Sequence, residues 1–194
     1  MATIGYRDGT ILTTKQLGGS IRLRELRLGD AAGLAEAYLR NRIHLAPWEP
    51  VRNEVFYSVP GQESEVKNMT DECAAGRCCA WVLLDGSKII GRATLSGIVK
   101  GAFRSAALGY WIDAEYQGRG LATSMVRLVA EYSLNILSLH RIQAETLLRN
   151  LGSQRVLGKA GFEEIGMAPK YLCIAGEWQD HKMFQKVLYD NQGP

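Results

Sequence analysis

The chain has 194 residues, which suits a single domain with one hydrophobic core. It is 46% hydrophobic and 22% charged, as globular proteins commonly are, and its net charge of +3 is too small to indicate a nucleic-acid interface. The four cysteines include no Cys-x-x-Cys pair and there are three histidines, so we expect no metal site and free thiols. A signal peptide and a long apolar run are both absent, so we expect a cytoplasmic protein without membrane contact.

The N-terminal part predicts one strand and one helix. Residues 1–19 contain a turn-forming Asp8-Gly9 pair that favours a hairpin, and we treat them as an extension of a single domain spanning residues 1–194. Residues 20–26 alternate apolar and polar side chains, as a half-buried strand does. Asp30 predicts the N-cap of a helix whose buried face carries Leu34, Ala37 and Tyr38.

An irregular segment and a hairpin follow. Residues 44–60 contain three prolines and Trp48, a tryptophan that either lines a binding cleft or covers the core. Residues 62–76 predict a second helix with Val66, Met69 and Cys73 on one face. Residues 78–85 and 88–99, joined by a turn at Asp85-Gly86-Ser87, predict a β-hairpin that continues an antiparallel meander.

The most informative stretch is a strand, a glycine-containing turn and a helix. Residues 107–113 are rich in aromatic and β-branched side chains and predict a strand. Gly118 and Gly120 follow in the turn, and the helix after it has a face formed by Leu121, Met125, Leu128, Val129, Tyr132 and Ile136. The first N–H groups of a helix lack internal acceptors and carry partial positive charge, and glycine lets an anion approach them. The stretch therefore predicts a phosphate site, to which Arg119 adds a cation.

Other interpretations of the turn fit less well or remain open. A tight turn without a ligand explains the two glycines equally simply. Walker A requires Gly-Lys-Ser/Thr, which this turn lacks, and the dinucleotide fingerprint requires a third glycine or alanine where Thr123 stands. A nucleotide-binding protein is therefore disfavoured.

The C-terminal part predicts a parallel crossover followed by closing strands. Residues 141–146 form a strand reached through a helix, which favours parallel pairing with the strand before it. Asn150 predicts the cap of a short helix. Residues 162–167, 170–174 and 180–188 predict three further strands, so the whole chain is an α/β domain with antiparallel ends and a parallel centre.

Two motifs in this order resemble those of the GNAT family of acyl-CoA-dependent N-acetyltransferases. They are Gln117-Gly118-Arg119-Gly120-Leu121-Ala122 and Asn150-x-x-Ser153-x-x-Val156-Leu157-x-Lys159-x-Gly161-Phe162. The Gly-Tyr-Trp-Ile strand, His140-Arg141 and Gly176-Glu177-Trp178-x-Asp180-His181 are similar to the RimJ/RimL branch, whose members acetylate the N-terminal amines of ribosomal proteins. The similarity runs from about Ile21 to Leu188.

The resemblance implies a fold and a cofactor site. The fold is a mixed, mostly antiparallel sheet of six to seven strands, splayed between the fourth and fifth, with about four helices. The pantetheine of acetyl-CoA would lie in the splay like an added strand, near the backbone of Trp111 and Ile112, where an N–H could stabilise the thioester oxygen. The pyrophosphate would bind Gln117, Gly118, Arg119, Gly120, Leu121, Ala122 and Thr123, with Asn150 and Ser153 facing the same ligand.

The chemistry requires a proton donor for sulfur and a base for the amine. Ser153 is the candidate donor by its position in the family motif, with a hydrogen bond inside the helix as its alternative role. Glu145 is the candidate base because its strand flanks the cleft, and a solvated strand residue is the alternative interpretation of this position. Asp113, Glu115 and Glu164 are weaker candidates, and we expect structural roles for His44 and His181.

The pKa of the acceptor amine bears on which class of amine the protein can acetylate. An α-amine has a pKa near 7.7–8.0 and lysine one near 10.4, so deprotonating lysine costs roughly 3.5 kcal/mol more. Because the sequence shows no unmistakable base, the α-amine of a protein N-terminus, in particular that of a ribosomal protein, is the favoured acceptor. A small amine such as an antibiotic, polyamine or amino acid, and a noncatalytic acyl-CoA-binding module, remain alternatives. We expect no metal, and a monomer or homodimer.

Overall fold

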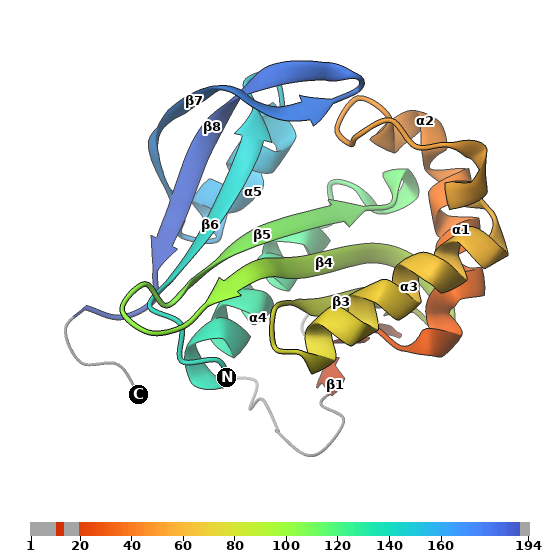
Figure 1. Cartoon of the computed structure of the whole chain (residues 1–194), viewed down its shortest axis with the longest axis horizontal. Helices are drawn as coiled ribbons and strands as arrows, with labels where there is room; N and C mark the ends of the chain where they lie inside the picture. Colours follow the sequence, from red (N-terminus) through yellow and green to blue (C-terminus); the bar gives the residue numbers. More distant parts are fainter. Residues whose placement is uncertain (1–10, 14–19, 191–194) are drawn as a thin grey trace.

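A computed structural model of the chain describes residues 11–13 and 20–190 (Figure 1). The hairpin expected at Asp8-Gly9 lies outside the described residues. Five α-helices are present in the described part: α1 (Ala31–Arg40), α2 (Arg42–Leu45), α3 (Val59–Ala74), α4 (Leu121–Asn135) and α5 (Leu151–Lys159). The strands are β1 (Ile11–Thr13), β2 (Ile21–Glu25), β3 (Cys79–Asp85), β4 (Lys88–Val99), β5 (Ser105–Ile112), β6 (Arg141–Leu147), β7 (Glu163–Ile174) and β8 (Glu177–Val187).

The strands form one mixed sheet in the order β1-β2-β3-β4-β5-β6-β8-β7. All neighbours are antiparallel except β5 and β6, which are parallel because α4 carries the chain back between them. The α/β class and the parallel centre predicted from the sequence are thus confirmed. Seven strands follow residue 20, as expected, and the three-residue β1 adds an eighth from the N-terminal extension.

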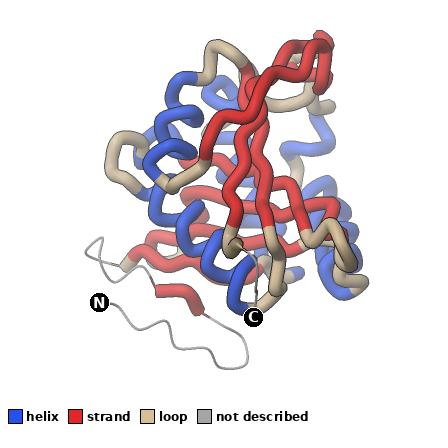
Figure 2. The backbone as a smooth tube through the Cα atoms, turned by 90° about the vertical axis from the view of Figure 1, so that its left-hand side faces the viewer, coloured by secondary structure: helices blue, strands red, loops and turns tan. Residues whose placement is uncertain are grey.

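Helices cover both faces of the sheet, as Figure 2 shows from the side. On one face, α1 and α3 bury side chains such as Leu34, Tyr38 and Val66 against β3 and the start of β4. On the other face, α4 and α5 pack Met125, Val129 and Leu157, among others, on the central strands. No helix among the described residues is long and apolar enough to cross a bilayer.

Three local predictions differ from the structure in detail. Asp30 occupies the N-cap position of α1, but its carboxylate binds Arg24 and the Arg27 N–H instead of capping the helix. Ile136 lies one residue beyond α4 and is 46% exposed, so it is not part of the buried face. Helix α3 begins three residues earlier than expected, because Ser58 caps it and a proline at Pro60 is tolerated in a first turn.

Two of the predicted closing strands are one strand. β7 runs through Pro169 and Lys170 with a break in its register, where proline lacks an N–H and Lys170 has a φ of +47°. The Lys170 N–H donates to Asp180 Oδ1 at 2.9 Å, which holds the bulge against β8. The resulting β7–β8 hairpin reaches over the segment that follows α2 (Figure 1).

Candidate active site

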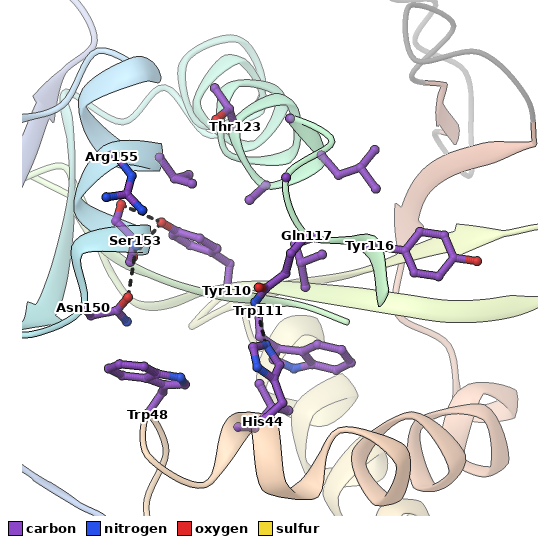
Figure 3. A pocket seen from close by; sticks show the side chains of 18 of the residues that line it. His44, Trp48, Tyr110, Trp111, Tyr116, Gln117, Thr123, Asn150, Ser153 and Arg155 are labelled. Carbon is purple, nitrogen blue, oxygen red and sulfur yellow. Dashed lines mark hydrogen bonds between the residues drawn. The ribbon is translucent and has the colours of Figure 1, made fainter. Parts of the chain in front are cut away.

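The central feature is a cleft where β5 and β6 part. The two strands pair only from Ser105 to Ala107 on β5 and from Arg141 to Gln143 on β6. Farther along, β5 stays bonded to β4 as far as Ile112, while its other edge has left β6. A cavity of about 410 Å³ opens there (Figure 3). It is lined by His44, Leu45, Trp48, Glu49, Tyr110, Trp111, Ile112, Tyr116, Gln117, Gly118, Gly120, Leu121, Ala122, Thr123, Asn150, Gly152, Ser153, Arg155, Val156 and Lys159.

One end of the cleft is a main-chain cradle at the start of α4. Gly118 and Gly120 have φ values of +74° and +76°, a region that favours glycine. The first helical hydrogen bond runs from the Ser124 N–H to the Gly120 carbonyl at 3.0 Å, so the N–H groups of residues 121–123 have no acceptor inside the helix. A Cβ added at either glycine would meet no described atom within 4 Å, so the space in front of the turn is open. These donors and the dipole of a 15-residue helix suit an anion.

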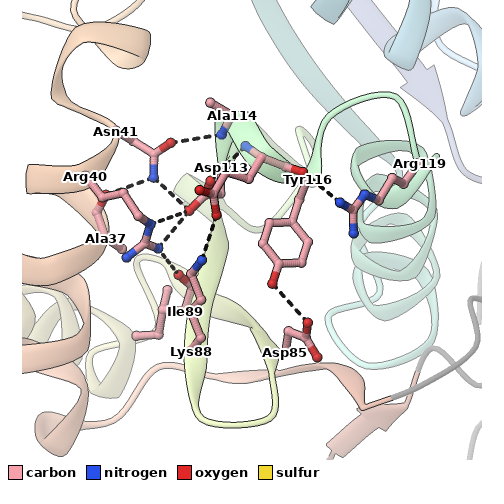
Figure 4. A network of polar contacts seen from close by, with 11 residues as sticks. Ala37, Arg40, Asn41, Asp85, Lys88, Ile89, Asp113, Ala114, Tyr116 and Arg119 are labelled. Carbon is pink, nitrogen blue, oxygen red and sulfur yellow. Dashed lines mark hydrogen bonds and ion pairs between the residues drawn. The ribbon is translucent and has the colours of Figure 1, made fainter.

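A buried ion pair fixes the strand end that precedes the cradle (Figure 4). The carboxylate of Asp113, 1% exposed, accepts hydrogen bonds from Arg40 Nε at 2.8 Å, Asn41 Nδ2 at 3.0 Å and the Glu115 N–H at 3.0 Å. Asn41 Oδ1 in turn accepts from the Ala114 N–H at 2.9 Å. Burial alone would raise the pKa of Asp113, but these hydrogen bonds and the Arg40 charge hold it below its usual value. The network joins α1 to the turn after β5.

The wall contributed by α5 brings two hydroxyl groups together. Asn150 Oδ1 caps the helix by accepting from the Ser153 N–H at 3.0 Å. Ser153 Oγ lies 2.7 Å from the phenol oxygen of Tyr110, whose side chain crosses from β5. Burial raises the pKa of Tyr110 to about 12, so this phenol stays protonated at neutral pH. Arg155 and Lys159 follow on the same helix and add positive charge to this wall.

A further wall comes from α2 and the segment after it. Trp48 and Glu49 line the cavity, so the tryptophan whose role the sequence left open borders the cleft. His44 Nε2 lies 2.9 Å from Gln117 Nε2, which links this wall to the cradle. Burial raises the pKa of Glu49, an effect that the charges of Arg52 and Arg92 oppose.

The predicted cofactor residues come together with one exception. Trp111, Ile112, Gln117, Gly118, Gly120, Leu121, Ala122, Thr123, Asn150 and Ser153 all line the cavity. Arg119 does not: its guanidinium donates to the Glu115 carbonyl at 2.9 Å and lies 4.8 Å from the centre of the Tyr116 ring. Its expected contribution as a cation to the phosphate site therefore has no support from its position.

None of the four predicted base candidates lines the cavity. Glu145, on β6, does not line the cavity, and burial raises its pKa. Asp113 is held by Arg40, Glu115 by Lys88 and Glu164 by Lys182. His181 is 3% exposed and its Nδ1 lies 2.9 Å from the Gln179 carbonyl, which fits the structural role expected of it, whereas His44 lines the cavity.

Sequence reasoning missed several polar side chains of the site, among them Arg155, Tyr110 and Glu49. Tyr110 alternates with Trp111 on β5, and the period of two along a strand could have placed it on the face toward α5. Glu49 stands in a Pro-Trp-Glu-Pro sequence whose tryptophan either lines a cleft or covers the core by sequence, and nothing in that sequence marks its carboxylate as functional. No local pattern identifies the partner of either side chain, since Tyr110 and Ser153 are 43 positions apart.

The cleft thus has three chemically distinct parts. Main-chain N–H groups, with Arg155 and Lys159 nearby, suit phosphates at one end. A serine–tyrosine hydroxyl pair stands in the middle, and a carboxylate beside Trp48 at the other end. In the part of the chain that the structure describes, no three His, Cys, Asp or Glu side chains gather as a metal-binding group.

Comparison with known proteins agrees with this geometry. The family described as acetyltransferase (GNAT) domain matches residues 20–163. The chain is 36% identical over 182 residues to the [ribosomal protein uS5]-alanine N-acetyltransferase of Escherichia coli, covering 91% of this chain and 92% of the relative.

Two solved structures are also similar. The ribosomal-protein-S5-alanine acetyltransferase from Vibrio fischeri superposes with a TM-score of 0.85 at 34% identity, covering 89% of this chain and 96% of that one. RimJ from Mycobacterium smegmatis, in complex with CoA-disulfide, superposes with a TM-score of 0.83 at 31% identity, covering 87% of this chain and 82% of that one.

Proposed function

The chain belongs to the GNAT acetyltransferase family as an acyltransferase of the RimJ type, and from this premise we propose that it transfers acetyl from acetyl-CoA to the N-terminal α-amine of a protein, in particular a ribosomal protein. The observation that carries the proposal is the cleft between β5 and β6, with its main-chain cradle at Gly118–Thr123. The relatives named above act on a ribosomal-protein alanine or contain coenzyme A, which supports the same substrates here.

The residues present fit the coenzyme. A diphosphate needs backbone donors and room for close approach, and the two positive-φ glycines with open space in front of them supply both. Arg155 and Lys159 lie along the wall beside the cradle and add positive charge for further phosphate groups. The unpaired edge of β5 around Trp111 and Ile112 can bind an extended amide chain as a strand would.

Acetyl-CoA supplies an activated carbonyl with a thiolate leaving group. The backbone of Trp111 and Ile112 lines the place where an N–H could stabilise charge on the carbonyl oxygen. Ser153 would donate a proton to the departing sulfur, and the Tyr110 phenol, 2.7 Å away and protonated at neutral pH, would hold the serine hydroxyl in place. The sequence-based choice of Glu145 as the base stays a prediction.

Charge at the acceptor end supports a single amine over a polyamine. Among the described residues that line the cavity, Glu49 alone has a carboxylate, and Arg52 and Arg92 stand close to it. A polyamine would bring several positive charges toward these guanidinium groups, which costs electrostatic energy. The α-amine of a peptide brings one positive charge, and deprotonating it costs roughly 3.5 kcal/mol less than deprotonating a lysine side chain.

The test is a panel of acceptors assayed by release of free thiol from acetyl-CoA. Peptides beginning with alanine or serine should give a higher kcat/KM than spermidine, a free amino acid or an aminoglycoside. Peptides of the same sequence with a blocked N-terminus serve as controls and should give no transfer. Faster turnover of a small amine than of any peptide would contradict the proposed acceptor and support the small-amine alternative.

A further inference from the structure

We infer that Glu49 is the base of the acetyl transfer: its carboxylate takes the proton from the acceptor amine. The inference rests on the proposed function and adds a residue to it. Among the described residues that line the cavity, Glu49 supplies the carboxylate, from the segment that follows α2, whereas Ser153 and its hydroxyl partner come from α5 and β5. Figure 3 shows its neighbour Trp48 and the Ser153 side chain at the same cavity. The cavity thus holds a carboxylate that can take a proton from an amine and, on different elements, a hydroxyl pair that can give one to sulfur.

The backbone around Glu49 is held from three directions. Its carbonyl accepts from the Ala175 N–H at 3.0 Å, at the tip of the β7–β8 hairpin. Arg149 Nη2 donates to the Pro47 carbonyl at 3.2 Å, and its guanidinium lies 5.6 Å from the centre of the Trp48 ring. The Trp48 N–H donates to the Leu45 carbonyl at 2.8 Å. A base must be placed within hydrogen-bond reach of the proton it takes, and these contacts fix where Glu49 stands.

The Glu49 carboxylate is also free to receive a proton. Within the described residues, no side chain forms a hydrogen bond or an ion pair with it, in contrast to Asp113, which Arg40, Asn41 and the Glu115 N–H hold as an anion. Glu49 is half-buried, and burial raises its pKa, which makes it a stronger base than an exposed glutamate.

The charged and titratable groups around Glu49 come from several elements. Arg52 in the same segment and Arg92 on β4 favour its ionised form. Tyr38 on α1 lies close enough for its own pKa to be raised in part by Glu49, after a larger effect of burial. His44 on α2 lines the same cavity, but its Nε2 faces the Gln117 amide. The net effect at Glu49 is still a raised pKa.

Glu145, the other candidate, is placed differently. It is paired with Met183 of β8 along β6, at positions where β6 no longer pairs with β5, and it does not line the cavity. Its charge acts on Tyr171 of β7 and contributes to the raised pKa of that phenol, behind burial. Because Glu145 does not line the cavity, a proton from the acceptor amine would have to pass beyond the lining residues to reach it.

Two protons leave the acceptor nitrogen in each turnover. The acceptor enters as an ammonium and gives one proton to Glu49, directly or through one water. The neutral nitrogen then forms the C–N bond as the C–S bond breaks, and it gives up a second proton. Sulfur takes a proton from Ser153, and the second proton from nitrogen restores the serine hydroxyl. Glu49 passes the first proton to solvent and is ionised again, so one proton per turnover is released.

The experiment compares Glu49→Gln with Glu54→Gln across a pH series. Both glutamates lie in the segment between α2 and α3, but Glu54 is exposed, pairs with Arg42 and does not line the cavity. Each variant is assayed with whichever acceptor of the panel the unaltered protein uses best, so a wrong acceptor assignment does not affect the result. Unchanged acetyl-CoA affinity, measured by calorimetry, shows that the fold and the cofactor site persist.

We expect Glu49→Gln to lower kcat at pH 7 by about 10²-fold or more, with a smaller change in KM. The rate of the unaltered protein should fall in acid as Glu49 takes up a proton. Glu49→Gln should lose this acid limb and instead rise through the pKa of the amine. Glu49→Asp, which keeps a carboxylate, should recover part of kcat, and Glu54→Gln should behave as the unaltered protein does.

Three outcomes would overturn the assignment. The first is a rate of Glu49→Gln that still falls in acid. The second is a rate that no longer falls in acid in Glu145→Gln or His44→Gln, while the pH profile of Glu49→Gln matches that of the unaltered protein. The third is an unchanged kcat in Glu49→Gln. If no acceptor in the panel is acetylated by the unaltered protein, the proposed function fails together with the base.

Discussion

The cradle before α4 gives the most quantitative prediction, through Gly120→Ala. An alanine at a φ of +76° costs about 1–2 kcal/mol of backbone strain, and its methyl group enters the open space in front of the helix. A hydrogen bond from an N–H to a charged oxygen contributes about 1.5–3 kcal/mol, so losing one weakens acetyl-CoA binding by roughly 10- to 150-fold. At a concentration of about 100 times the original Kd, the ligand would then stabilise the variant by about 0.4 kcal/mol instead of about 2.7, for a 100-fold loss.

Calorimetric titration and thermal unfolding with and without acetyl-CoA measure these quantities. Gly76→Ala is the matched control, because Gly76 has a φ of +71° and open space around it but lies outside the cavity. Both variants should lose similar stability without ligand, and only Gly120→Ala should lose affinity. Equal acetyl-CoA affinity in the two variants would refute the assignment of this turn as the phosphate site.

Two further predictions concern the hydroxyl pair and the buried ion pair. Ser153→Ala should lower kcat by about 10²-fold with little change in acetyl-CoA affinity. Tyr110→Phe should lower kcat by only about 5-fold, because it removes one hydrogen bond to the Ser153 hydroxyl. Steady-state kinetics measures both effects, and an unchanged kcat in Ser153→Ala would show that this serine has a purely structural role. Asp113→Asn should reduce the free energy of unfolding in urea at pH 7 by about 3 kcal/mol, since it leaves Arg40 without its counter-charge. Because folding lowers the pKa of Asp113, its stabilisation is complete above its usual pKa of about 3.9 and is lost as the pH falls through the native value. The difference between variant and unaltered protein should therefore shrink at pH 3.5, and a difference that stays constant would contradict this account of the pair.

The parts of the site that could be predicted from sequence are the local ones. A strand, a glycine turn and an amphipathic helix lie consecutively in the chain, so residues 107–135 could be assigned and their anion site inferred from helix geometry alone. The Asn150 cap was equally accessible, since a side chain accepting from the N–H three residues later is a local pattern.

The parts that could not be predicted depend on contacts between distant segments. The backbone of Glu49 is held at the cleft by Ala175, which lies 126 positions later at the tip of the β7–β8 hairpin and donates its N–H to the Glu49 carbonyl. Ser153 gains its hydroxyl partner only when α5 packs beside β5. The Asp30 carboxylate does not cap α1, because both of its oxygens accept hydrogen bonds from Arg24 on the preceding strand.

The proposed transfer to an α-amine is tested most directly by locating the acetyl group on a product. The acceptor is a peptide that begins with alanine and carries one internal lysine, incubated with acetyl-CoA and the protein, and then fragmented in a mass spectrometer. The cleft described above predicts a single acetyl group on the α-nitrogen of the alanine. Acetyl on the lysine side chain, or an unmodified peptide under conditions in which spermidine is acetylated, would contradict it.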